Sequence, residues 1–200
     1  MKPNPVRNSL DYRFTLDSLI ETLEKIADWR NIDSQHGERT AITAIKIATQ
    51  LDEQLDEGQL MLLDYAARLH DLGRIGISDS IMSKPGSLTT SERGAMETHP
   101  EIGYNFLYRS NLPPEITLTI LHHHEHFDGS GYPRGLKGLD IPLFARIVTI
   151  ADMWDALTND RPYRKALAYS AAVNVMSVNS SWFDPRLYVI FMDTLRVRKS

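Results

Sequence analysis

Apolar residues recur at helical spacing along nearly the whole chain. Between Leu16 and Ala27 they stand three and four positions apart, which places them on one face of an amphipathic helix. Residues 41–51 carry a wide apolar face, and residues 60–69 are apolar nearly all round, as in a helix that is buried on every side. No stretch supports an order of strands. The pattern therefore predicts an all-α fold.

Capping residues and prolines indicate where further helices begin. Thr89 and Glu92 fit a capping box, which opens a helix that we expect to run to about Tyr108. Prolines suit the first turn of a helix, where a missing N–H has no intrahelical partner to lose. Such starts predict helices over residues 114–122, 142–157 and from 185 onward. Residues 73–86 and 128–140 are expected to be loops, and the second is long enough to indicate a functional loop.

Composition narrows the class of protein. A hydrophobic content of 42% in 200 residues suffices for one sizeable core and hardly for two. The net charge of −4 argues against a DNA-binding surface, so a nucleotide would have to be held by local cations. Without cysteine, neither a disulfide framework nor a thiolate metal site can form. No apolar run reaches membrane-spanning length and no secretory signal opens the chain, so we expect a soluble cytoplasmic protein.

Histidine and aspartate are the main candidates for chemistry. His70 is followed at once by Asp71 at the end of the buried helix, and the adjacent histidines 122–124 close another helix. Asp152 and Asp155 lie one turn apart on the most apolar helix. A carboxylate there is costly unless a cation or hydrogen bonds compensate for its burial. These positions suggest a buried polar site shared by several helices.

Each of these features also has a simpler explanation. Adjacent histidines suit a solvated helix terminus, where cations complement the helix dipole. Asp152 and Asp155 could be paired with Arg161 or Arg164, and a lone histidine such as His36 is more often structural. A metal site would be absent only if all of these explanations applied at the same time. Imidazole and carboxylate without thiolate form the ligand set of Mn, Fe, Co, Ni or Zn rather than that of a calcium cage.

Long motifs then follow one another along the chain. They are His70-Asp71-Leu72-Gly73-Arg74, Lys84-Pro85-Gly86, His99-Pro100, His123-His124-Glu125, Asp128-Gly129-Ser130-Gly131-Tyr132-Pro133, Ile150-Ala151-Asp152 and Arg161-Pro162-Tyr163-Arg164. In order and spacing they resemble the HD-GYP family, a subset of the HD phosphohydrolases. The resemblance covers roughly residues 28–191. It implies one helical HD-type catalytic domain over residues 14–200, behind an N-terminal tip or linker over residues 1–13.

The resemblance implies a site for two metal ions. One ion would take His36, His70, Asp71 and Asp152, and the other would take Asp71, His99, His123 and His124, so that Asp71 bridges them. Divalent transition metals are implied, Fe or Mn first, with Ni, Co, Zn or Mg as alternatives. Ile32 stands where members with a third metal carry glutamate, so two ions are expected. His122 and His126 are left over and are interpreted as structural.

The resemblance also implies an activity, the hydrolysis of cyclic di-GMP to linear pGpG and, in some members, onward to GMP. A hydroxide between the two ions would attack phosphorus and expel the 3′-oxygen of the ring. The implied substrate-binding residues are Arg74, Tyr132, Arg161 and Arg164, and the implied catalytic residues are Asp71, Arg74 and Asp155. A regulatory or GGDEF-type domain is an expected partner through the Gly-Tyr-Pro loop, and neither DNA nor a membrane is expected as one.

Arg74 departs from the lysine that is usual in the family. Arginine keeps the charge but does not give up a proton at ordinary pH, which argues against a general acid at this position. Two other functions stay open. One is hydrolysis of another cyclic or linear dinucleotide. The other is a module that binds cyclic di-GMP or docks a partner domain, with catalysis weak or lost.

Overall fold

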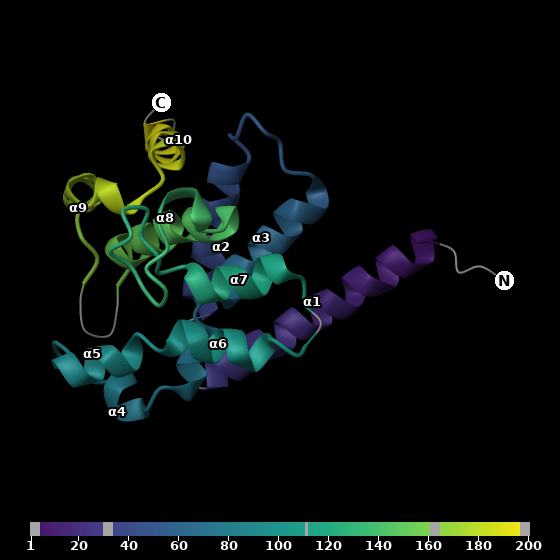
Figure 1. The fold of residues 1–200 in the computed structure, drawn as a ribbon, viewed down its shortest axis with the longest axis horizontal. Coiled ribbons are helices and arrows are strands. Elements are labelled where there is room, and N and C mark those ends of the chain that lie inside the picture. Colours follow the sequence, from purple (N-terminus) through teal and green to yellow (C-terminus); the bar gives the residue numbers. More distant parts are fainter. Residues whose placement is uncertain (1–4, 30–33, 111, 161–164, 197–200) are drawn as a thin grey trace.

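The computed structural model describes residues 5–29, 34–110, 112–160 and 165–196 (Figure 1). Its α-helices are α1 Pro5–Trp29, α2 Ser34–Ala48, α3 Glu57–Leu69, α4 Asp79–Met82, α5 Thr90–Met96, α6 His99–Leu107, α7 Pro114–His122, α8 Leu143–Thr158, α9 Tyr169–Val178 and α10 Pro185–Arg196. Short 3-10 turns are η1 Leu72–Gly76, η2 Gly138–Asp140 and η3 Ser180–Trp182. No strand occurs among these residues, so the predicted all-α class is confirmed. Within the same ranges, no helix is both long and apolar enough to cross a bilayer.

Several boundaries differ from the expected ones. The first helix begins at Pro5, so residues 5–13 are helical where a tip or linker was expected. The capping box at Thr89 is present, but the helix expected to reach Tyr108 is divided into α5 and α6. The reason is Pro100, which lacks an N–H and would clash with the preceding turn inside a continuous helix. The expected loop over residues 73–86 contains most of η1 and the short helix α4, and α9 is a helix that the sequence pattern did not predict.

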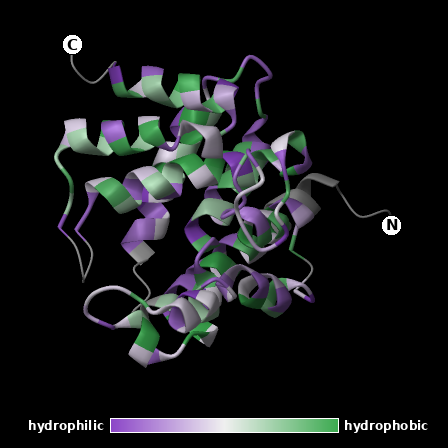
Figure 2. Ribbon diagram, turned by 60° about the vertical axis from the view of Figure 1, so that its left-hand side comes forward, coloured by the Kyte–Doolittle hydropathy of each residue, from purple (hydrophilic) through white to green (hydrophobic). Residues whose placement is uncertain are grey.

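Helix α3 lies between two hydrophobic clusters, which is why its sequence is apolar on every side. Leu63 and Ala67 pack into a cluster formed with α2, α8 and α10. Ala66 and Leu69 pack on the other side into a cluster formed with α1 and α7. Figure 2 shows apolar and polar residues alternating along the helices, as expected where one face is buried.

Helix packing brings distant parts of the chain to one place. Helix α2 packs on α3 and α8, while α6 packs on η1 and α7. The contact of η1 with α6 needs glycine, because a Cβ atom on Gly73 would lie 1.9 Å from the carbonyl oxygen of His99. As a result the start of α2, the end of α3, the start of α6 and the end of α7 meet beside the middle of α8.

Candidate active site

The seven predicted metal ligands converge on one buried site. The side chains of His36, His70 and Asp71 form one group of possible ligands. A second group shares Asp71 and adds three histidines, which are His99, His123 and His124. Asp152 joins the first group, since its Oδ1 lies 3.0 Å from His36 Nε2 and 3.7 Å from His70 Nε2. The structure therefore brings together every residue of the predicted ligand set.

Asp71 faces both groups with different oxygens. Its Oδ2 lies 3.4 Å from His70 Nε2 and 3.6 Å from His36 Nε2. Its Oδ1 lies 3.2 Å from His99 Nε2 and 3.9 Å from His123 Nε2. A carboxylate in this position can bind one cation with each oxygen, which is the geometry of a bridging ligand.

Backbone carbonyls orient three of the histidines. The Nδ1 of His70 hydrogen-bonds the carbonyl oxygen of Ala67 at 2.6 Å, three residues earlier. The same contact joins His99 to Met96 and His123 to Ile120, each at 2.8 Å. A carbonyl oxygen can only accept, so Nδ1 carries a proton, and Nε2 is the ring nitrogen that faces the centre of the site. Second contacts of this kind are usual for metal-binding histidines.

Asp155 orients a fourth histidine, His36, by contacting Nδ1, the ring nitrogen that does not face Asp71. Its Oδ2 lies 2.6 Å from His36 Nδ1, and its Oδ1 accepts hydrogen bonds at 2.7 Å from Arg39 Nε and from Asn159 Nδ2. This carboxylate therefore contacts His36 and not the centre of the site. Pairing of the two aspartates with Arg161 or Arg164 was the alternative interpretation, and both arginines lie outside the described residues, as does Ile32.

The electrostatics keep carboxylates charged and two imidazoles neutral. Burial raises the pKa of Asp71, but the charges of Arg74 and His70 outweigh it and hold that pKa well below its ordinary value. Burial lowers the pKa of His124 to about 3, and the neighbouring His99 adds to the effect. His123 has a pKa well below its ordinary value for the same reasons, burial first. Ionised carboxylates and neutral imidazoles are the forms that bind metal ions.

His70 provides a further test of whether a cation fits. It is fully buried, and its Nε2 has no hydrogen-bond partner among the described residues. Burial lowers the pKa of His70, but the charge of Asp71 and the nearby carboxylate of Asp152 outweigh it and raise this pKa to about 10. A cation bound among these acceptors would take the place of that proton. The donor set of imidazole nitrogens and carboxylate oxygens fits a divalent transition metal.

The Gly-Tyr-Pro loop is fixed against the candidate ligand His124. The N–H of Tyr132 donates to the carbonyl oxygen of His124 at 3.1 Å, and the two rings lie 4.8 Å apart. Gly131 permits this approach, because a Cβ atom there would lie 2.4 Å from the same carbonyl oxygen. Tyr132 therefore stands beside the candidate metal ligands, and its role as a residue that faces the substrate stays a prediction.

Glu125 holds the same loop in place through hydrogen bonds to its backbone, a role that was not predicted from the sequence. Its side chain is buried and accepts hydrogen bonds from the backbone N–H groups of Arg134, at 2.7 Å, and Leu136, at 3.0 Å. The position of Glu125, directly between the histidine pair and a glycine-rich loop, was the available signal. Next to it, His126 stacks on Trp182 with ring centres 4.3 Å apart, which agrees with its interpretation as structural.

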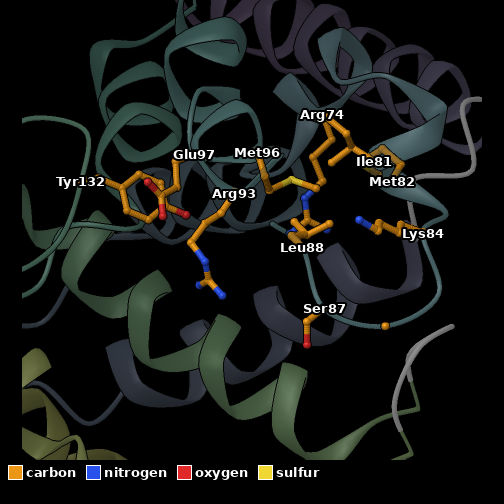
Figure 3. A pocket seen from close by; sticks show the side chains of 11 residues that line it. Arg74, Ile81, Met82, Lys84, Ser87, Leu88, Arg93, Met96, Glu97 and Tyr132 are labelled. Carbon is orange, nitrogen blue, oxygen red and sulfur yellow. The ribbon is translucent and has the colours of Figure 1, made fainter. Parts of the chain in front are cut away.

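A cavity of about 560 Å³ opens beside the cluster (Figure 3). It is within the size range of small-ligand sites in proteins. Arg74 and Tyr132 line it and also touch the cluster, since Arg74 Nη1 lies 2.9 Å from Asp71 Oδ2. Three further charged residues line the cavity, which are Lys84, Arg93 and Glu97, and of these only Lys84 belongs to a motif quoted from the sequence.

Comparison with known proteins identifies the family. The family model described as HD domain matches residues 21–187. The cyclic di-GMP phosphodiesterase response regulator RpfG of Xanthomonas campestris is 43% identical over 83% of this chain and 45% of its own length. The 3′3′-cGAMP-specific phosphodiesterase 3 of Vibrio cholerae is 36% identical over 91% of this chain and 40% of its own length. The chain thus spans less than half the length of these curated relatives.

A solved structure supports the fold independently. Bd1817, an HDG"Y"P protein from Bdellovibrio bacteriovorus, superposes with a TM-score of 0.68 over 82% of this chain and 52% of its own, at 21% identity. Identity at this level establishes a shared fold and no more. With the matching family model and the Gly131-Tyr132-Pro133 motif beside the histidine cluster, the chain belongs to the HD domain family, in its HD-GYP branch.

Proposed function

We propose that this domain is a metal-dependent phosphodiesterase that opens cyclic di-GMP to linear pGpG, with onward hydrolysis to GMP as a further step. The observation that carries the proposal is Asp71, whose two oxygens face separate histidine groups at the edge of a cavity of nucleotide size. The names of the curated relatives, which act on cyclic dinucleotides, support the choice of substrate.

Two divalent ions would be held by the two groups that share Asp71, with Asp152 completing the first group. Fe and Mn are the favoured metals, and Ni, Co, Zn or Mg are alternatives. When bound, such ions neutralise phosphate oxygens and lower the pKa of a coordinated water towards 7, which provides a nucleophile at neutral pH. The Nε2 atoms that His36, His70, His99 and His123 direct inward would be used for this binding.

Arg74 is the residue of this chain best placed to hold a phosphate. Its guanidinium already lies beside Asp71 and lines the cavity, so it can donate two parallel hydrogen bonds to phosphate oxygens. Water adds to phosphorus and loses one proton to solvent, the bond from phosphorus to the 3′-oxygen breaks, and that oxygen must take up a proton. Arginine does not supply this proton at ordinary pH, so the proton would come from solvent. This arrangement favours binding over rapid cleavage.

Asp155 is proposed as a positioning residue rather than a group that contacts substrate. Its hydrogen bond holds the His36 ring so that Nε2 points towards Asp71 and Asp152. This carboxylate stays charged, because the hydrogen bonds with His36 and then with Arg39 outweigh the effect of burial and lower the pKa of Asp155.

Arg161 and Arg164 are proposed as further substrate contacts on the strength of their motif alone. Replacing either with alanine is expected to raise the Michaelis constant for cyclic di-GMP while metal content stays unchanged. A charge-assisted contact of this kind contributes roughly 1.5–3 kcal/mol. Normal affinity with a lowered melting temperature would instead indicate a structural pairing with Asp155.

A second candidate substrate is 3′3′-cyclic GMP-AMP. It is favoured by the Vibrio cholerae relative, which is 36% identical over most of this chain and is named for that substrate. The Xanthomonas relative is named as a response regulator and is more than twice as long as the matched region, which supports a regulatory partner domain. A regulatory or GGDEF-type domain on the Gly-Tyr-Pro loop and a cytoplasmic location are part of the proposal. If Arg74 prevents turnover, this domain would be a module that binds cyclic di-GMP without cleaving it.

One experiment tests the proposal. Protein purified with added Mn or Fe would be analysed for metal content and incubated with cyclic di-GMP and with cyclic GMP-AMP, and the products would be identified by chromatography. We expect about two ions per chain, as in two-metal sites, and linear dinucleotide product. Asp71→Asn, which keeps the side-chain shape but not the charge, serves as the matched inactive control. Neither metal nor product under any condition would contradict the proposed function.

A further inference from the structure

Two opposite charges stand one turn apart on the cavity wall without pairing. Arg93 lies in α5, and Glu97 caps the carboxyl end of this helix four residues later. Residues at this spacing lie on one helix face, where a glutamate and an arginine often form an ion pair. Here neither side chain has an ion pair or a hydrogen bond to any part of the chain that the structure describes, although both line the cavity.

The other charged residues of the cavity are already engaged. Arg74 lies against Asp71, and Lys84 Nζ lies 2.6 Å and 2.8 Å from the two carboxylate oxygens of Glu92. Figure 3 shows Glu97 beside Tyr132, with Arg93 extending from the same wall into the open space. Arg93 and Glu97 therefore offer five N–H donors and a carboxylate acceptor to whatever enters the cavity.

Guanine is the base whose edge matches this pair. Its N1–H and N2 amino group are adjacent donors that a carboxylate can accept together, and its O6 and N7 are acceptors that arginine binds with two hydrogen bonds. Adenine presents the reverse pattern, with an acceptor at N1 and a donor at N6. At this wall adenine would direct a lone pair at Glu97 and an amino group at Arg93, and both contacts would be repulsive.

The position of Tyr132 connects this wall to the reaction centre. Its ring lies 4.8 Å from the ring of His124, and Figure 3 shows Glu97 next to Tyr132. A nucleotide with its base at Glu97 would lie beside Tyr132, and the cavity continues from there to Arg74, which Figure 3 shows on the opposite side. The cavity can accommodate a base at one end and a phosphate at the other.

We propose that Arg93 and Glu97 recognise one guanine base of the substrate and make this domain selective for guanine-containing over adenine-only dinucleotides. The inference rests on the proposed function and deepens it, since it assigns base selection to two residues of α5 and its cap. Wild-type protein accordingly cleaves cyclic di-GMP in strong preference to cyclic di-AMP.

The test measures binding separately from cleavage. Calorimetric titrations of the Mn-loaded full chain with GMP and with AMP report base preference without any reaction. Wild type is expected to bind GMP at least about tenfold more tightly, the scale of one bidentate base contact. Glu97→Gln should reduce that ratio about tenfold, because an amide can pair with adenine as well. The ratio of kcat/KM for the two cyclic dinucleotides should fall in parallel.

Glu115→Gln is the matched control, since Glu115 is an exposed glutamate on α7 that does not line the cavity. It should leave the base preference unchanged, and metal analysis should give the same content in both variants. Equal affinity of wild type for GMP and AMP, binding of neither, or an unchanged ratio in Glu97→Gln would overturn the inference. Failure of the proposed function would look different, with GMP preferred but no cyclic dinucleotide cleaved.

Discussion

The histidine–aspartate cluster and the charged wall of the cavity differ in how they are held. Five of the seven cluster residues are almost fully buried, with His36 at 1% and His70 at 0% exposure, and backbone carbonyls or Asp155 fix four of the rings. The cavity wall is built on short helices at the surface, and its lysine, Lys84, is 31% exposed in its side chain. The proposed metal chemistry is thus located in the tightly packed core, and the proposed selection among bases lies where exposed side chains can adjust.

The difference has a physical cause. Metal binding needs several donor atoms at fixed separations. Side chains that a packed core already holds in place keep this geometry without losing further conformational freedom on binding. Recognition of a base needs complementary donors and acceptors, which a short surface helix can present. We therefore expect changes in the cluster to abolish function and changes in the wall to alter preference.

The largest effect is expected for Asp71→Ala. Because its two oxygens face both ligand groups, removing this carboxylate should lower metal content from about two ions per chain to near zero. His36→Ala should weaken mainly the first group and leave about one ion bound. Elemental analysis of both variants decides the point, and an Asp71→Ala protein that keeps one ion would show that the carboxylate is not shared.

Arg74 contacts the cluster and also lines the cavity, and Arg74→Lys tests what this residue does in the reaction. Lysine can hold phosphate as arginine does and can also protonate the departing 3′-oxygen, a contribution of about 10²–10⁴ in rate where general acid catalysis operates. We expect faster single-turnover cleavage of cyclic di-GMP with unchanged metal content. A lysine variant that is equal or slower would mean that this cation only holds phosphate.

Asp155→Asn should have an intermediate effect. The variant loses the charge that holds His36 and Arg39 but keeps the shape of the side chain, so metal affinity should fall about 10- to 100-fold, as for other residues that orient a ligand. Competition with a chelator measures that affinity. A purely structural role would instead lower the melting temperature and leave affinity in the folded fraction unchanged.

The smallest effect is expected at the start of α5. Lys84 and then Thr89 lower the pKa of Glu92 to about 2 from an ordinary value of 4.5. Since the folded-state pKa is the lower one, this stabilisation is fully present above about pH 4.5 and is lost as pH falls towards 2. Melting temperatures of wild type and Glu92→Gln should therefore differ at pH 6 and approach each other near pH 3. A constant difference across this range would contradict the assignment.

Local features of the sequence predicted much of the fold correctly. The capping box at Thr89 and the proline-led starts of α7 and α10 depend on neighbours within a few residues, and the structure confirms them. Pro100 was also a local signal, since it divides α5 from α6, but the helical periodicity on both sides concealed it. Helix α9 buries only Ala172 and Met176, so its sequence carries little of the amphipathic pattern that reveals a helix.

The sequence by itself determined the helical class through its periodicity, and its resemblance to the HD-GYP family indicated the seven candidate ligands. Only the tertiary structure showed that Asp155 holds His36, 119 residues away, and that Glu125 anchors the Gly-Tyr-Pro loop. It alone also placed Arg93 and Glu97 on the wall of a cavity beside Asp71. The reason is physical: a hydrogen bond or a cavity wall between distant segments depends on how helices pack, which local sequence does not encode.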